Sequence, residues 1–142
     1  MTFPVTIYHN PACGTSRNVL DLIVAAGYEP EVVLYLDAGW SETQLRALFQ
    51  SAGLTARSAL RETKSPAEAL GLLDPGVSEE MLLCEMLAHP ILVNRPFVIT
   101  PKGTKLCRPS EAVLDLLERW PPGPYSKEDG TLLIDAAGKR VV

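Results

Sequence analysis

The chain has 142 residues, of which 46% are hydrophobic and 21% are charged, a length and composition typical of one compact globular domain. Its 13 Lys and Arg residues against 17 Asp and Glu residues give a net charge of −4, which does not favour nucleic acid or an anionic membrane as a partner. The sequence shows neither an apolar run of about 20 residues nor a secretion signal in its first ten residues. We therefore expect a cytoplasmic protein.

The cysteine count argues against a disulfide framework and against a metal site. The three cysteines, Cys13, Cys84 and Cys107, lack the paired spacing of either. His9 and His89 are the only imidazole groups in the sequence. We expect no metal and no bound cofactor.

The N-terminal part of the chain has the pattern of a β-α-β unit. A β-favouring run at Val5–Tyr8 is followed by a helical pattern from Ser16 to a stop at Gly27. Residues Glu31–Leu36 have the composition of a buried strand, which a right-handed crossover would pair in parallel with the first. One face of the helix carries the residues expected to point inward: Leu20, Ile23 and Val24.

A helical insertion is expected over about residues 41–89. Two capping boxes, Ser41 with Gln44 and Ser65 with Glu68, mark helix starts. Further helices are expected at residues 55–60 and from residue 78 to just before residue 90. The apolar residues of the first and last of these helices predict their inward faces: Leu45, Leu48, Phe49, Leu82, Leu83, Met86 and Leu87.

The pattern of the C-terminal part predicts three short extended segments, two of which pair, and then a helix. Short extended segments are expected at Ile91–Val93, Phe97–Thr100 and Thr104–Cys107, the last two paired antiparallel around a Pro-Lys-Gly turn. A helix should begin near Pro109 and extend to Trp120. A tail over about residues 121–142 follows, in which residues 132–134 form a hairpin or lie on the surface.

The order of these elements defines the expected fold class. A β-α-β unit, a helical insertion and then β-β-α predict a single α/β domain over residues 1–142 with a thioredoxin-like mixed sheet. In such a fold a proline leading into the strand opposite a redox cysteine, here Pro96, is the place of a cis peptide bond. The general frequency of cis bonds before proline is only about 5–6%, which by itself favours trans, so the sequence leaves the isomer at Pro96 open.

Cys13 lies between the end of the first strand and the start of the first helix. The free amide groups and positive dipole of a helix N-terminus favour a thiolate, and Arg17 adds a cation nearby. The same amides can bind an oxyanion. The alternative, in which Cys13 is only a small loop residue, does not explain why a glycine and two hydroxyl residues follow it.

The spacing around Cys13 limits the chemistry. Residues 13–16 have the Cys-x-x-Cys spacing of a dithiol oxidoreductase, but Ser16 occupies the position of the resolving cysteine, so an outside thiol would be needed. A phosphatase-type loop needs five residues between its cysteine and arginine. Cys13 and Arg17 are separated by three, which disfavours that alternative.

Three arginines, Arg61, Arg95 and Arg108, lie at element ends or beside turn signals. A guanidinium group suits an oxyanion because it donates two hydrogen bonds at once and stays charged. The sequence does not show whether the three converge, and for any one of them taken alone a solvated or structural role is favoured.

The remaining histidines and cysteines have less specific patterns. His9 could stabilise a Cys13 thiolate, or it could simply hydrogen-bond within its loop. His89 is expected to cap a helix, and Cys84 to be a small core residue. Cys107 ends a strand next to Arg108 and is expected near the site without being needed there.

Three segments carry a resemblance to a known family: Ile7–Asn18, His89–Pro96 and Gly103–Glu111. Together they resemble the glutaredoxin-coupled arsenate reductases of the thioredoxin-like superfamily. The similarity extends over nearly the whole chain and includes residues 127–130 and 137–140 of the tail.

The resemblance implies a function and a set of site residues. Cys13 would attack arsenate and form a covalent thiol-arsenate ester, with His9 supporting its thiolate. Arg61, Arg95 and Arg108 would bind the oxyanion. Glutathione would be the co-substrate and glutaredoxin the partner that resolves the mixed disulfide, releasing arsenite in arsenical detoxification.

Two other functions remain open at this point. A superfamily transcriptional regulator that binds RNA polymerase would use a Cys-x-x-Cys switch, which Ser16 argues against. A thiol reductase acting on another substrate would keep Cys13 but would not need all three of Arg61, Arg95 and Arg108.

Overall fold

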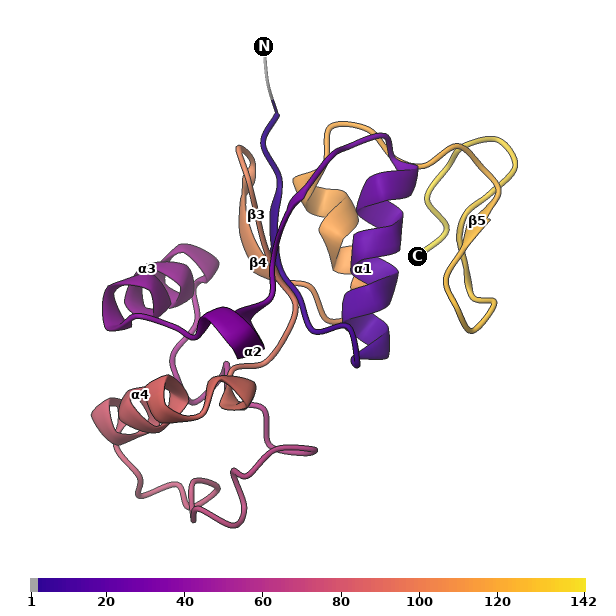
Figure 1. The fold of residues 1–142 in the computed structure, drawn as a ribbon. Helices are drawn as coiled ribbons and strands as arrows, with labels where there is room; N and C mark the ends of the chain where they lie inside the picture. Colours follow the sequence, from indigo (N-terminus) through magenta and orange to yellow (C-terminus); the bar gives the residue numbers. More distant parts are fainter. Residues whose placement is uncertain (1–2) are drawn as a thin grey trace. The chain divides into compact units, whose positions relative to one another are not determined.

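The computed structural model describes residues 3–142, which form two compact units. The first unit contains residues 3–33 and 95–142, and the second unit is Leu34–Asn94 (Figure 1). The second unit includes the expected helical insertion but begins and ends several residues outside it. Among residues 3–142, no helix combines the length and apolar character needed to cross a membrane.

The first unit is built on a four-stranded mixed sheet in the order β2-β1-β3-β4. Strand β1 (Thr6–Tyr8) pairs in parallel with β2 (Glu31–Val33) and antiparallel with β3 (Phe97–Thr100). Strand β3 pairs antiparallel with β4 (Gly103–Leu106). This arrangement confirms the thioredoxin-like mixed sheet.

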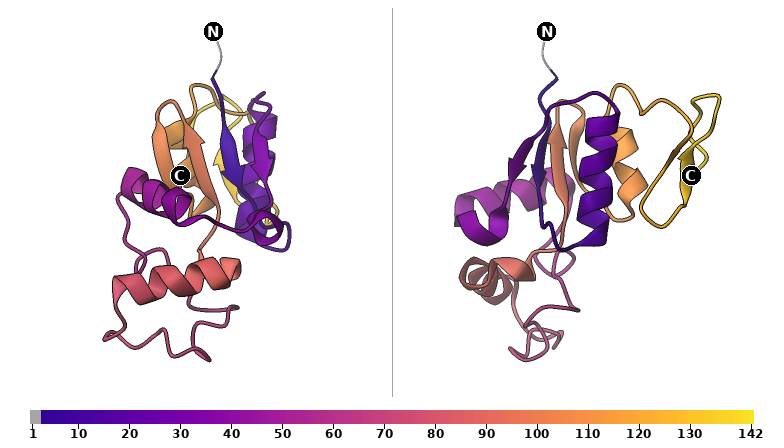
Figure 2. Two further views of the ribbon diagram at one scale, coloured as in Figure 1. Left: turned by 60° about the vertical axis from the view of Figure 1, so that its left-hand side comes forward. Right: turned by 45° about the vertical axis from the view of Figure 1, so that its right-hand side comes forward.

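One face of the sheet is covered by helix α1 (Gly14–Ala25) and the 3₁₀ helix η2 (Ser110–Leu116) (Figure 2). Alternate strand residues such as Ile7 and Val98 point into this layer and are fully buried, as the two-residue period of a strand requires. The two helices contribute further large members of this core: Val19, Leu22, Ile23, Val113, Leu114 and Leu116.

The C-terminal tail forms the hairpin that was one of its two expected conformations. Strands β5 (Tyr125–Ser126) and β6 (Leu132–Ile134) pair antiparallel. Leu133 and Ile134 are fully buried in the same core as α1 and η2. The tail is therefore an integral layer of the first unit.

Three details of the first unit differ from the sequence-based expectations. Strand β2 ends at Val33, because the chain turns into a short helix from Tyr35 onward. It is the edge strand of the sheet, and its side chains are mostly exposed rather than buried. Val24 is 55% exposed, since the buried face of α1 is formed by other residues: Val19, Leu22 and Ile23. The last helix is a 3₁₀ helix that ends at Leu116 and leaves Trp120 partly exposed.

The early end of η2 has a tertiary cause. The backbone amides of Glu118 and Arg119 both donate to the hydroxyl of Tyr28, at 3.0 Å each. These amides therefore find a partner outside their own segment, and Leu117 adopts an extended backbone. The local apolar pattern that predicted a longer helix does not contain this contact.

The second unit contains the helices α2 (Tyr35–Ala38), α3 (Glu42–Ala52) and α4 (Glu79–Ala88) and the 3₁₀ helix η1 (Pro90–Leu92). The capping box of Ser41 and Gln44 is present at the start of α3. Ser78 caps α4 by accepting a hydrogen bond from the amide of Met81. These caps satisfy amides that the helix itself leaves free. As expected, the helices bury Leu45, Leu48, Phe49, Leu82, Leu83 and Met86.

Other expectations for this unit were wrong. Residues 56–59 and 66–73 form turns rather than helices, and residues 90–92 form η1 rather than an extended segment. Ser65 accepts from the amide of Ala67 instead of capping a helix. In the segment of residues 66–73, Gly71 has a φ of 74°. This left-handed conformation interrupts α-helical hydrogen bonding, so the segment does not continue as a helix.

Candidate active site

A tight loop joins β1 to α1 and ends at Cys13, which is the N-cap residue of α1. The amide of Cys13 donates to the carbonyl of Asn10 at 3.0 Å, and the side-chain oxygen of Asn10 accepts from the amide of Ala12 at 3.0 Å. Asn and Pro are residues that favour such turns. The loop thereby presents the Cys13 sulfur at the positive end of the helix dipole.

Two arginines that follow the second unit in the chain lie beside this sulfur. Arg108 directs its Nη1 atom at the sulfur of Cys13, 3.8 Å away, and donates from the same atom to the backbone carbonyl of Arg95 at 3.0 Å. Arg95 is buried, with 5% of its surface exposed, and Cys13 has 8% exposed. Each arginine precedes a cis proline, Pro96 and Pro109, which answers for Pro96 the question that the sequence left open.

These surroundings lower the pKa of the Cys13 thiol from its ordinary value to about 7. Burial alone would raise this pKa, because it disfavours the charged form. That effect is outweighed by the backbone amide of Ser16, by the hydrogen bond and charge of Arg95, and by the hydrogen bond of Arg108. About half of the thiol is therefore ionised at pH 7.

The pH dependence of Cys13 alkylation should show this directly. Because the thiolate is the nucleophile, the rate with iodoacetamide should rise through a midpoint near pH 7 and level off above it. An ordinary cysteine would be only about 3% ionised at pH 7. Mass spectrometry of the Cys13 peptide after timed quenching measures the rate, and a midpoint near pH 9 would contradict the lowered pKa.

His9 is connected to Cys13 through one intervening residue, Ser16. Its Nδ1 atom is 2.6 Å from the hydroxyl of Ser16, which also accepts from the amide of Asn10 at 3.1 Å. Burial, followed by the smaller and opposed effects of Asp21 and Arg17, lowers the pKa of His9. His9 is therefore neutral at pH 7 and contacts the Cys13 loop through a hydrogen bond to Ser16.

The structure thus brings together Cys13, Arg95 and Arg108, with His9 nearby. Arg61 belongs to the second unit, where its amide donates to the carbonyl of Leu92 at 2.7 Å. Its participation in the site stays a prediction from the sequence.

The other cysteines have different surroundings. Cys107 is fully buried in the core of the first unit, and burial raises its pKa to about 12, so its thiol is inert at neutral pH. Cys84 is exposed on α4. The expectation that Cys84 is a core residue was wrong because the buried positions of α4 are taken by Leu82, Leu83 and Met86.

Sequence reasoning missed what Asn10 and Ser16 do in the loop. Both are buried, and their side chains hold the backbone of residues 10–12. The spacing Asn-Pro-x-Cys could have indicated the Asn10 contact, since asparagine commonly bonds to an amide two residues on. For the residues from Phe3 onward, no cluster of three or more His, Cys, Asp or Glu side chains has the geometry of a metal site.

Comparisons with known proteins agree with one another. The model of the ArsC family matches residues 8–116. The chain is 61% identical over 137 residues to a protein of Synechocystis sp. named "Arsenate reductase ArsI2", covering 96% of this chain and 98% of that protein. It is 50% identical to an Escherichia coli protein named "Arsenate reductase", covering 96% and 97% of the two chains.

A solved structure is also similar. The structure titled "Arsenate reductase from Vibrio cholerae" superimposes with a TM-score of 0.77 at 36% sequence identity, covering 82% of this chain and 100% of that one. The family match includes Cys13, Arg61, Arg95 and Arg108 within its 109-residue span of residues 8–116. Sequence, fold and site therefore lead to one conclusion, that this chain belongs to the ArsC family.

Proposed function

We propose that this protein reduces arsenate to arsenite, with glutathione as co-substrate and a glutaredoxin as partner. The names of its relatives in Synechocystis and Escherichia coli support the substrate. The observation that carries the proposal is the pairing of a thiol whose pKa is about 7, that of Cys13, with the guanidinium groups of Arg95 and Arg108. A nucleophile and an oxyanion-binding group thus share one site.

The first step of the proposed reaction is a substitution at arsenic. The Cys13 thiolate attacks the As(V) atom, an S–As bond forms, and one arsenate oxygen leaves as water after taking up protons from solvent. Arg95 and Arg108 would neutralise the negative charge that accumulates on the remaining oxygens. Free backbone amides at the start of α1 add further hydrogen-bond donors for an anion.

The second step supplies two electrons from outside the chain. A glutathione thiolate would attack the Cys13 sulfur of the adduct, so that the S–As bond breaks with its electron pair left on arsenic, arsenite leaves as As(III), and a disulfide forms between Cys13 and glutathione. Ser16 cannot provide a resolving thiol, and Cys107 is buried with a raised pKa. Glutaredoxin would then resolve this Cys13–glutathione disulfide by thiol–disulfide exchange, which returns Cys13 to its thiolate, so that both electrons come in net from outside the chain. Because this chemistry needs a reducing thiol pool, we assign it to the cytoplasm.

Two further residues have proposed roles. Arg61 would bind arsenate together with Arg95 and Arg108. His9 would support the thiolate by positioning Ser16, because the lowered pKa of His9 leaves its ring uncharged at pH 7.

A coupled assay tests the proposal. The protein is mixed with glutathione, glutaredoxin, glutathione reductase and NADPH, and arsenate is added last while NADPH absorbance is followed. We expect oxidation that requires arsenate and the protein and that stops when either glutathione or glutaredoxin is omitted. Reactions without arsenate and without protein serve as controls. Arsenite formation, measured by separating the two arsenic species, confirms the product.

The assay distinguishes the proposal from its alternatives. A folded protein whose Cys13 alkylates rapidly at pH 7 but which consumes no NADPH with arsenate would contradict arsenate reduction. Activity that persists without glutaredoxin would contradict the proposed partner while leaving the substrate intact.

A further inference from the structure

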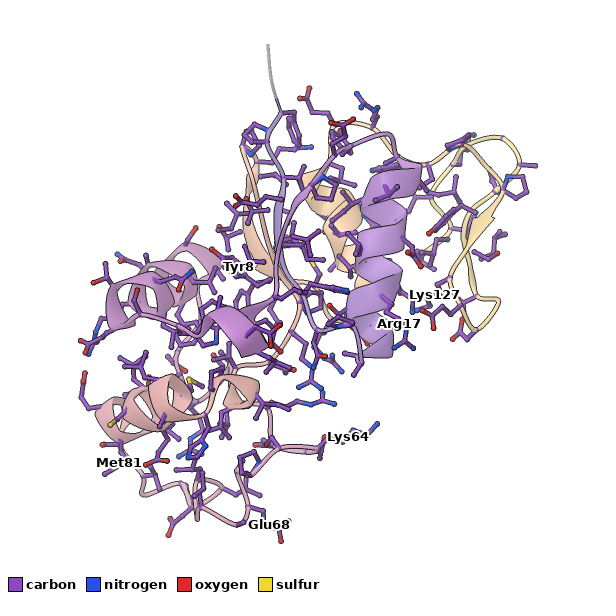
Figure 3. The ribbon with its side chains drawn as sticks, in the orientation of Figure 1. Tyr8, Arg17, Lys64, Glu68, Met81 and Lys127 are labelled. Carbon is purple, nitrogen blue, oxygen red and sulfur yellow. The ribbon has the colours of Figure 1, made fainter. Side chains whose placement is uncertain are left out.

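The C-terminal hairpin, residues 125–134, is attached to the start of helix α1. Glu128 forms a two-pronged ion pair with Arg17, in which Nε and Nη2 of the arginine donate to the two carboxylate oxygens at 3.0 and 3.1 Å. The amide of Glu128 also donates to the side chain of Asn18 at 2.9 Å. Figure 3 shows Arg17 and the neighbouring hairpin residue Lys127 together at the N-terminal end of α1.

Arg17 connects this ion pair to the loop that carries Cys13. Its remaining terminal nitrogen, Nη1, donates to the carbonyl of Pro11 at 2.9 Å. The amide of the same peptide group, that of Ala12, donates to the side chain of Asn10 at 3.0 Å. The peptide plane between Pro11 and Ala12 is therefore hydrogen-bonded at both its carbonyl and its amide, and the bond at the carbonyl depends on Arg17.

The hairpin is itself fixed to the body of the first unit. Leu133 and Ile134 are fully buried, and Lys127 forms an ion pair with Glu111 of η2 at 3.3 Å. The side chains of this second ion pair are only 17% and 19% exposed. Glu128 is consequently held at a defined position relative to α1, which makes it a suitable anchor for the Arg17 side chain.

We propose that the C-terminal hairpin, through Glu128 and Arg17, holds the Cys13 loop in its reactive conformation, with both acting as positioning residues. The side chains of the ion pair are 43% and 42% exposed, and ion pairs this exposed contribute little to stability. Its effect therefore falls on the geometry of the loop more than on the stability of the fold. This inference deepens the arsenate reductase function proposed above.

Charge alone would act in the opposite direction. Glu128 is an anion near the site, so removing it should stabilise the Cys13 thiolate and accelerate its reactions if the only effect were electrostatic. Positioning predicts the reverse, since a freed Arg17 no longer fixes the Pro11 carbonyl and the loop amides lose their arrangement around the sulfur. The sign of the change thus separates the two explanations.

The test measures Cys13 alkylation by iodoacetamide at pH 7 in Glu128→Ala. We expect the rate to fall by about threefold to fivefold, the change that follows from a rise of the Cys13 pKa by roughly 0.7 to 1 unit. The alkylation rate of Arg17→Ala should fall by at least the same factor. The double variant should fall no further than Arg17→Ala alone, because Glu128 acts through Arg17.

Asp115→Ala is the matched control. Asp115 joins η2 to the tail through an ion pair with Arg140 at 2.6 Å, and its side chain is 46% exposed, close to the 42% of Glu128. Like Glu128→Ala, this substitution removes one negative charge and one ion pair with the tail, but at a position away from the Cys13 loop. Its alkylation rate should equal that of the unaltered protein, and the melting temperatures of both variants should change by no more than a few degrees.

Three results would overturn the inference. An unchanged or faster alkylation rate in Glu128→Ala excludes positioning. A loss of rate in Asp115→Ala equal to that in Glu128→Ala shows a general effect of loosening the tail. A double variant whose loss of rate is the product of the two single losses excludes the route through Arg17. The alkylation readout needs no arsenate. If Cys13 of the unaltered protein is alkylated as expected but the protein does not reduce arsenate, the proposed function is wrong. The positioning role is still decided by the alkylation rates of the variants.

Discussion

Replacement of Cys13 by serine is expected to abolish arsenate reduction, with a loss of roughly 10³-fold or more in rate. A serine hydroxyl at this position stays protonated at neutral pH, whereas the Cys13 thiol, with a pKa of about 7, is about half ionised there. The helix dipole and the two arginines would then have no thiolate to stabilise. The coupled NADPH assay measures the loss, and circular dichroism shows whether Cys13→Ser is folded.

Cys84→Ser is the matched control for this substitution. Cys84 is an exposed cysteine of the second unit, and the proposed reaction takes its other thiols from glutathione and glutaredoxin. We expect the Cys84→Ser protein to retain most of its activity. If it were folded yet as inactive as Cys13→Ser, the reaction would use two thiols of this chain and the proposed scheme would be wrong.

Substitution of either arginine by alanine should weaken arsenate binding and catalysis more than it weakens the fold. We expect kcat/KM for arsenate to fall by about 10²–10³-fold in Arg95→Ala and in Arg108→Ala. Loss of either cation should also raise the pKa of Cys13, because both lower it in the native site. Alkylation at pH 7 should therefore slow together with turnover.

The measurement combines kinetics with a thermal melt. Arg140→Ala is a suitable control, since Arg140 belongs to the same unit and forms an ion pair with Asp115 without touching Cys13. Arg108→Lys retains the charge but not the forked donor geometry, so it should recover the alkylation rate more fully than arsenate turnover. Variants of Arg95 or Arg108 that simply melt at lower temperature, with kcat/KM preserved below the melt, would make these residues structural.

The position of Cys13 could be predicted because its causes are close together in the sequence. A β-favouring run, an Asn-Pro turn and a helical pattern follow one another within residues 5–27. Each of these signals acts over a few residues. Together they put Cys13 at the N-cap of α1, where the structure has it, and the backbone amide of Ser16 in this unit is one of the causes that lower its pKa.

The helices that were predicted too long or in the wrong place show the limit of such local signals. The capping pattern of Ser41 produced a helix, whereas the similar pattern at Ser65 did not. The turn after Ser65 ends because Gly71 adopts a left-handed conformation. Helix η2 ends because the backbone amides that follow it donate to the hydroxyl of Tyr28. Intrinsic helix preferences are weak, so contacts from elsewhere in the chain decide the outcome.

The sequence by itself therefore determined the strand-loop-helix unit of Cys13, the mixed sheet and the residue types suited to an oxyanion. Only the tertiary structure decided which distant charges meet at that unit. Arg108 reaches the Cys13 sulfur from 95 positions away in the chain, and Glu128 reaches Arg17 from 111. The physical reason is that a charged side chain carries no local signal of its eventual partner, since that partner is set by how strands and hairpin pack around the core.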